Sequence, residues 1–192
     1  MKKLLVIGFV FLAACQNKDG SKPTADSSAT VALHKGTNSD SLSLGLSDLM
    51  NNYYLLKDAF IREDLAQIDR TASSLSTTSD KLPLGKMKAD VAIIETAKVS
   101  AQSIVAEIQG LLGEKNIEDK RKSFQTISEQ LYDLLRTVGY DQEIVYHFSC
   151  ADALGGSGAT WLNNRHKVQN PYLPKQDKPC GDIIDSLDFS KK

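Results

Sequence analysis

The stretch MKADVAIIETAKVSAQSIVAEIQGLLG, residues 87–113, decides the fold class that the sequence predicts. Its apolar residues recur at three- and four-residue spacing, which is the period of one face of an α-helix. They are Met87, Val91, Ile94, Ala101, Ile104, Val105, Ile108, Leu111 and Leu112. The stripe stops at Gly113, and glycine commonly caps the C-terminus of a helix. We therefore predict a long helix that buries this face against other helices.

Two earlier stretches share this period. Apolar residues between Leu46 and Phe60 predict a first helix, with Ser47 as a candidate N-cap. Residues 65–75 continue the spacing in a second helix, after a break near residues 62–64. We expect the Ser/Thr-rich run 73–80 and Pro83 to end that helix.

A fourth helix is predicted from about residue 116 to residue 138, closed by Gly139. Its charged residues 118–122 are expected to face the solvent. Four amphipathic helices with short connections are typical of an antiparallel bundle. We therefore predict an all-α fold: an antiparallel four-helix bundle over residues 42–140, followed by an irregular tail that contains a short strand.

The tail comprises residues 141–192, and we expect it to pack on the bundle as part of one domain. Residues 143–149 alternate with a two-residue period, which predicts the strand. Trp161, the only tryptophan, is expected to hold the tail against the helices. The glycine-rich residues 155–158 have neither the P-loop nor the nucleophile-elbow spacing, so we predict a protein that is not an enzyme.

The first fourteen residues have the layout of an export signal, because two lysines precede an apolar run that ends in Ala13-Ala14. The sequence Leu12-Ala13-Ala14-Cys15 resembles the bacterial lipobox, which predicts a signal peptide over residues 1–14 and lipidation of Cys15. Residues 15–41 are polar and predict a flexible tether. We expect a lipid-anchored protein of the cell envelope. Gln16 differs from the signal that retains lipoproteins in the inner membrane, which favours the outer membrane, on its periplasmic face or at the cell surface.

The formal charge of the whole chain is −1, and losing Lys2 and Lys3 with the signal makes it more negative. The sequence contains no basic run or stripe. A nucleic-acid partner is therefore not expected.

Four short pieces resemble a family of bacterial envelope domains, the domain of unknown function 3347. They are Tyr53-Tyr54-x-Leu56-Lys57-Asp58-Ala59, Gly158-Ala159-x-Trp161-Leu162, Asn170-Pro171-Tyr172 and Cys180-Gly181. Members of that family occur as lipoproteins and as domains attached to heavy-metal efflux adaptors. The resemblance therefore implies an association with copper or related metals, and an efflux or metal-handling envelope protein as partner.

The chain departs from the family at two positions. Asp152 stands where the family pattern Cys-Pro-Met-Ala has methionine, and Asp177 stands three residues before the second cysteine, where the family tends to have methionine. Thioether ligands favour Cu(I), whereas carboxylates suit zinc or harder ions. If the family holds copper with these residues, this chain has changed its metal or lost the site.

Two cysteines remain once Cys15 is lipidated, and the sequence leaves two interpretations open. An even number in an oxidising compartment predicts a Cys150–Cys180 disulfide. The alternative is a copper or zinc site. Its candidate ligands are His147, Cys150, Cys180, Asp152, Asp177 and His166.

The functional expectation follows these two interpretations. One is a non-enzymatic, lipid-anchored envelope protein that binds a metal ion or a protein partner through its tail. The other is a purely structural or interaction lipoprotein whose tail is closed by the disulfide. A thiol enzyme, in which His147 activates Cys150, is a third possibility.

Overall fold

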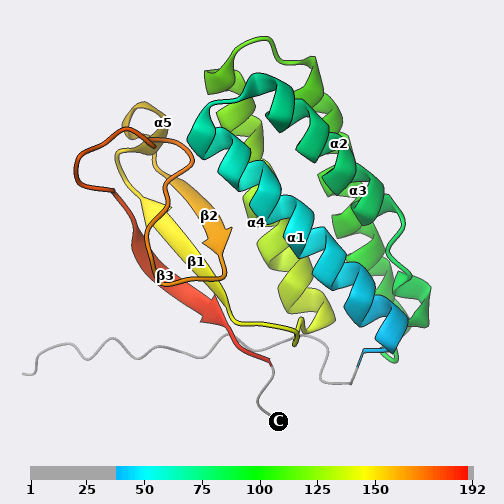
Figure 1. The fold of residues 1–192 in the computed structure, drawn as a ribbon. Coiled ribbons are helices and arrows are strands. Elements are labelled where there is room, and N and C mark those ends of the chain that lie inside the picture. The colour runs from blue at the N-terminus through cyan, green and yellow to red at the C-terminus, as the bar shows by residue number, and fades with distance from the viewer. Residues whose placement is uncertain (1–37, 190–192) are drawn as a thin grey trace, which may run out of the picture.

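The computed structural model describes residues 38–189 (Figure 1). In chain order the elements are α1 Asp40–Arg62, α2 Leu65–Asp80, the 3-10 turn η1 Leu84–Lys86, α3 Val91–Gly113, α4 Ile117–Val138, β1 Val145–Cys150, the short α5 Ala153–Gly156, β2 Ala159–Asn163 and β3 Asp182–Leu187. The predicted signal peptide, the lipidation site Cys15 and most of the predicted tether lie outside the described residues.

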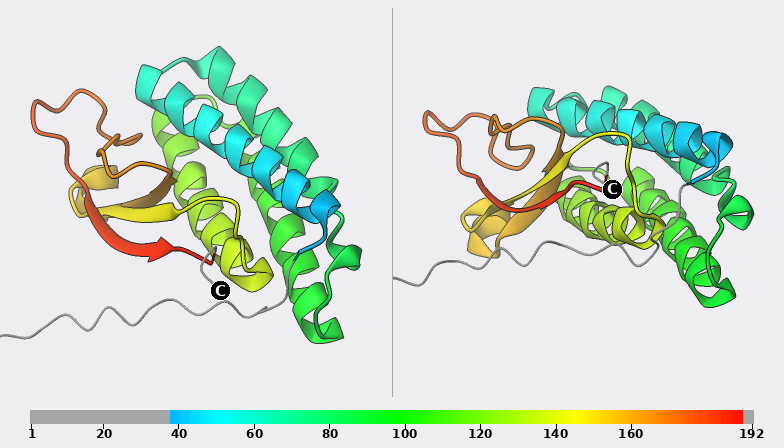
Figure 2. Two further views of the ribbon diagram at one scale, coloured as in Figure 1. Left: turned by 60° about the horizontal axis from the view of Figure 1, so that its bottom comes forward. Right: turned by 90° about the horizontal axis from the view of Figure 1, so that it is seen from below.

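The long helices pack in chain order: α1 against α2, α2 against α3, and α3 against α4. The small sheet lies beside α1 and α4, and α2 and α3 lie on the far side of those two helices (Figures 1 and 2). The predicted helical character is confirmed. No helix among residues 38–189 is long and apolar enough to cross a membrane.

The start of α1 differs from the prediction. The helix begins at Asp40, and Ser47 lies inside it with its hydroxyl donating to the Ser43 carbonyl oxygen at 3.0 Å. The break predicted near residues 62–64 is confirmed, because Glu63 adopts a left-handed conformation with φ 55°. Asp64 then caps α2 by accepting a hydrogen bond from the Gln67 backbone N–H at 2.9 Å.

The Ser/Thr-rich run 73–80 is itself helical, and α2 ends at its last residue, Asp80, ahead of Pro83. Its hydroxyls donate to the carbonyl oxygens four residues earlier: Ser73 to Asp69, Ser74 to Arg70, and Thr77 to Ser73. Such bonds satisfy the hydroxyl groups within the helix. Composition alone does not show that the run stays helical up to Asp80, because it does not show where each hydroxyl finds its partner.

Two details of the later helices also differ. Met87 is buried but precedes α3, which begins at Val91. The ends of α4 are confirmed, with Asn116 accepting from the Asp119 backbone N–H at 2.9 Å and Gly139 at φ 62°. The expectation that residues 118–122 all face solvent is wrong, because Lys120 and Arg121 are buried.

Residues 141–189 contain three strands where the sequence predicted one. They form an antiparallel sheet in the order β2-β1-β3, with a bulge in the β1–β3 pairing between His147 and Phe148. β2 also contacts α4. The sequence missed β2 and β3 because neither strand alternates between buried and exposed residues, so neither shows a two-residue period.

Candidate functional site

A disulfide between Cys150 and Cys180 closes most of the tail into one loop. Its Cα atoms are 5.5 Å apart, at the end of β1 and just before β3. The closed loop contains α5, β2 and the irregular residues 164–179. The disulfide interpretation of the sequence is therefore the one that the structure contains.

Trp161 is fully buried inside the tail, and Tyr172 links it to α4. Its ring stacks on Phe148 at 5.3 Å between centroids and meets Tyr172 edge-on at 6.1 Å. Tyr172 in turn contacts Phe124 of α4 at 5.9 Å. Gly181 lies against the same indole, and a Cβ there would be 2.7 Å from the ring. Even a methyl group at the residue after Cys180 would therefore force the indole to shift.

Two polar contacts place the tail against α1 and α4. The Tyr53 hydroxyl lies 2.8 Å from Ser128 Oγ and accepts a hydrogen bond from the Leu162 backbone N–H at 3.0 Å. The guanidinium of Arg121 donates to the Pro171 carbonyl oxygen at 3.1 Å, to Glu118 at 2.6 Å and to Glu63 at 3.2 Å. The position of the tail is thus set by specific bonds as well as by packing.

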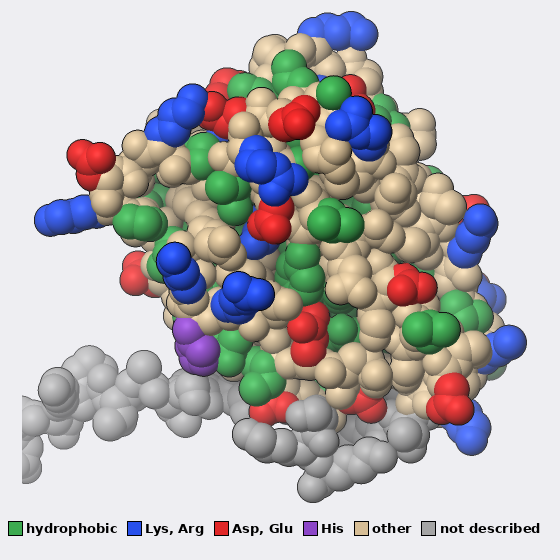
Figure 3. All heavy atoms as spheres, in the orientation of Figure 1, with side chains coloured by type: hydrophobic (Ala, Val, Ile, Leu, Met, Phe, Trp, Pro, Cys, Tyr) green, Lys and Arg blue, Asp and Glu red, His purple; other side chains and the backbone are tan. Residues whose placement is uncertain are grey.

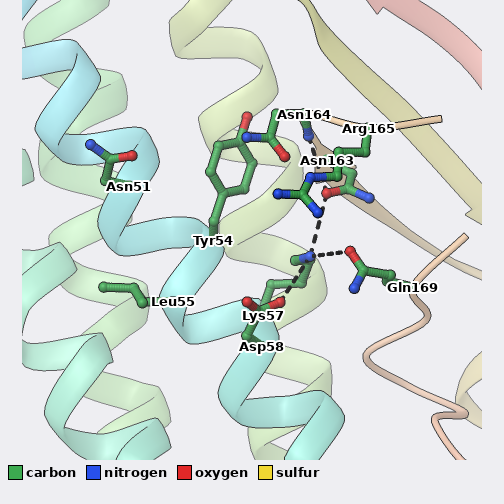
Figure 4. Close-up of a pocket in the computed structure, with 9 residues that line it drawn as sticks. All are labelled: Asn51, Tyr54, Leu55, Lys57, Asp58, Asn163, Asn164, Arg165 and Gln169. Carbon is green, nitrogen blue, oxygen red and sulfur yellow. Dashed lines mark hydrogen bonds and ion pairs between the residues drawn. The ribbon is translucent and has the colours of Figure 1, made fainter. Parts of the chain in front are cut away.

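A polar pocket of about 420 Å³ opens between α1 and the segment that ends β2 and follows it, residues 163–169 (Figure 4). We call it the Lys57 pocket. Its lining consists of Asn51, Tyr54, Leu55, Lys57, Asp58, Asn163, Asn164, Arg165 and Gln169. Because one wall belongs to α1 and the other to the disulfide-closed loop, the pocket exists only when the tail is in place.

Lys57 lies at the floor of this pocket, with only 3% of its side chain exposed. Its ammonium group is 3.0 Å from Asp58 Oδ1 and donates to the amide oxygens of Asn163 at 3.4 Å and Gln169 at 3.3 Å. Burial lowers the pKa of Lys57, and the nearby charge of Arg165 adds to this effect, while Asp58 opposes it. The charged ammonium is therefore incompletely stabilised by the protein.

Arg165 extends from the loop toward Lys57 across the pocket (Figure 4). It is exposed, and within residues 38–189 its guanidinium has no ion pair or hydrogen bond. Charged side chains of both signs are otherwise interspersed on the face drawn in Figure 3. Two close cations beside one carboxylate make this pocket electrostatically different from its surroundings.

The six candidate metal ligands are not brought together. Cys150 and Cys180 are bonded to each other, and Asp152 and Asp177 are exposed in separate turns. Within residues 38–189, no group of three or more His, Cys, Asp or Glu side chains is arranged to hold a metal ion.

The two histidines point to other neighbours. The ring of His166 lies 4.1 Å from that of Tyr146, while His147 is buried against Tyr132 at 4.2 Å between ring centroids. The Nε2 atom of His147 is 3.8 Å from Glu129 Oε1. The chain thus directs His147 toward α4 rather than toward the sulfur atoms.

The sequence analysis missed the Lys57 pocket. The available signal was Lys57 itself, which stands four residues after Tyr53 and three before Phe60, on the face of α1 that carries apolar side chains. Lysine is seldom fully buried unless it has partners. Arg165, Asn163 and Gln169 carry no such signal, because only the folded tail brings them to Lys57.

Comparisons with curated proteins and with solved structures found no match. A family model matches the chain over a region that ends before β1. This region includes the sequence piece around Tyr53 and excludes the three pieces in the tail that also resemble the family. Residues 49–143 of this chain match the family model described as "Protein of unknown function (DUF3347)", which supports the family resemblance of the helical part.

Proposed function

We propose that this chain is a non-enzymatic, lipid-anchored protein of the bacterial cell envelope that binds a partner through the surface formed by its tail and α1. The Lys57 pocket is the observation that carries this proposal. It is concave, it lies where two separate parts of the chain meet, and its lining includes Arg165, an exposed cation. The pocket is lined by side-chain amides and by the Lys57–Asp58 ion pair, and such groups can recognise a polar group of a partner.

The location follows from two independent features. The sequence around Cys15 has the lipobox layout, and the Cys150–Cys180 disulfide is typical of an oxidising compartment. The outer membrane is the proposed destination. The family resemblance supports an efflux or metal-handling envelope protein as the partner.

Binding of copper or zinc by the tail is the second interpretation from the sequence, and it would require the disulfide to be reduced first. Binding of a protein partner does not require reduction of the disulfide. We therefore place it ahead of metal binding.

A labelling experiment in cells tests the anchor. Radioactive palmitate should label the wild-type protein and leave a Cys15→Ser variant unlabelled, with the wild type in the outer-membrane fraction. An unlabelled wild type would contradict the proposed anchor.

Site-specific photo-crosslinking tests the binding surface. A photoreactive residue at Asn164, on the rim of the Lys57 pocket, should give one adduct of defined mass. The matched control places the same residue at Val99 on α3, which is 62% exposed and belongs to a helix away from the sheet (Figure 1). Equal adducts at both positions, or none at Asn164, would contradict binding at this surface.

A further inference from the structure

We infer that the Lys57 pocket binds a single carboxylate group. The inference rests on the proposed function, since it names the ligand chemistry of the same surface. The carboxylate would lie between the ammonium of Lys57 and the guanidinium of Arg165.

The charge balance of the lining is the first argument. Lys57 and Arg165 are positive, and Asp58 is the only negative lining residue. Asp58 has 41% of its side chain exposed and takes one contact of the ammonium, while the other two contacts go to neutral amide oxygens at 3.3 and 3.4 Å. These distances are longer than those typical of N–H···O hydrogen bonds. An incoming anion would therefore improve the environment of a buried charge.

Donor geometry is the second argument. The guanidinium of Arg165 is planar and matches a carboxylate with two parallel N–H bonds. Gln169 turns its amide oxygen toward Lys57, so its NH₂ group remains available to donate. Arg165 and Gln169 thus place donors near Lys57 from the tail side of the pocket (Figure 4).

The neighbouring charge limits the ligand to one negative charge. Glu143 lies just beyond the lining, where its oxygens accept from the Tyr54 hydroxyl at 3.0 Å and from the Asn164 amide at 3.4 Å. Glu143 is a second protein carboxylate beside the pocket, after Asp58. Its charge repels a bound dianion such as phosphate more strongly than a bound monoanion. The pocket volume of about 420 Å³ is near the lower end for ligand sites, which suits a small acid or a peptide C-terminus.

Calorimetric titration of the purified, oxidised protein tests this inference with matched probes. N-acetyl-alanine should bind saturably, and N-acetyl-alanine amide, which lacks the charge, should bind at least about tenfold more weakly. Inorganic phosphate should also bind more weakly than the acid. A four-residue acetylated peptide with a free C-terminus distinguishes the source: tighter binding than N-acetyl-alanine assigns the carboxylate to a protein terminus, and equal or weaker binding assigns it to a small acid.

The variant Arg165→Gln should weaken binding of the acid at least about tenfold, because it removes the charged donor pair while keeping a polar side chain. Lys167→Gln is the matched control, since Lys167 is an exposed cation in the same segment but does not line the pocket. Its binding should be unchanged.

Three results would overturn the inference: equal binding of acid and amide, unchanged binding by Arg165→Gln, or no saturable binding of either free acid below about 10 mM. If any of them occurs while the Asn164 cross-link persists, the carboxylate assignment fails and the proposed partner surface stands. Loss of the cross-link alone would refute the partner and leave the carboxylate site.

Discussion

The four long helices among residues 38–189 bury apolar side chains over most of their length, whereas the tail has a long stretch without regular structure and is closed by a disulfide. In the helices the core includes Phe60, Ile104 and Leu131, all without exposed surface. In the tail, residues 164–179 have no regular structure and are enclosed by the Cys150–Cys180 disulfide. The comparison teaches that the helices can fold from their own apolar faces, while the tail, and with it the Lys57 pocket, needs added bonds.

Removal of the disulfide is expected to change the stability of the tail more than any other substitution proposed below. The double variant Cys150→Ser, Cys180→Ser should lower the free energy of unfolding by about 3–4 kcal/mol, because a covalent loop of this size limits the unfolded chain. Far-ultraviolet circular dichroism should retain the helical signal, while Trp161 fluorescence should shift toward that of an exposed indole. Equal loss of both signals at one temperature would show that helices and tail are not separable.

Arg121 of α4 is a buried charged residue that links the helices to the tail. Its side chain is 4% exposed and joins the tail carbonyl of Pro171 to Glu63 and Glu118. Arg121→Met should cost about 2 kcal/mol in chemical denaturation, since it leaves a buried carbonyl without its donor. The adjacent Lys122→Met is the control, because Lys122 is 68% exposed, and its effect should stay within about 0.5 kcal/mol. Similar costs for both would contradict the role given to Arg121.

Replacing a glycine by alanine in each region tests how much room its packing leaves for a methyl group. Gly181→Ala should destabilise by about 1–3 kcal/mol, because the new methyl group would lie 2.7 Å from Trp161 and 2.9 Å from Val168. Gly110→Ala in α3 meets nothing within 4 Å and should stabilise by about 0.5–1 kcal/mol. Opposite signs in thermal unfolding are the expected result. A stabilising Gly181→Ala would mean that the tail is packed more loosely than described.

The smallest effect concerns pH and His147. Burial, the largest cause, lowers the pKa of His147 below 6.5, although the charges of Glu129, Asp185 and Asp133 oppose this. The unfolded chain therefore binds the proton at higher pH than the folded protein, so this contribution to stability is present above pH 6.5 and is lost as pH falls toward the folded-state pKa. Subtracting the stability profile of His147→Gln from that of the wild type should isolate this loss. A wild-type-minus-variant difference that grows as pH falls would contradict the direction.

The sequence predicted the helices well because each has many residues with one consistent period. It gave the correct ends where a local signal exists, as at Asn116 and Gly139, and failed where the outcome depends on partners elsewhere. Lys120 illustrates the limit: a charged residue on a polar stretch is buried because Asp69 and the Leu111 carbonyl oxygen, from other helices, accept from it at 2.7 and 2.8 Å.

The candidate site was less predictable for the same reason. Lys57 was visible as a charge on an apolar face, but Arg165 lies 108 positions later and has no local pattern. The metal hypothesis grouped six residues by type and proximity in the sequence. The fold separates them, since β-strand pairing sends His147 toward α4 and the cysteines toward each other.

Disulfide mapping of the protein isolated from the cell envelope tests the central claim most directly, because the tail and its pocket depend on the closed loop. Digestion without reduction, followed by mass spectrometry, should give one peptide pair joining Cys150 to Cys180, with no alkylated form of either residue. Recovery of both cysteines as alkylated free thiols would contradict the account and would reopen the metal site proposed from the sequence.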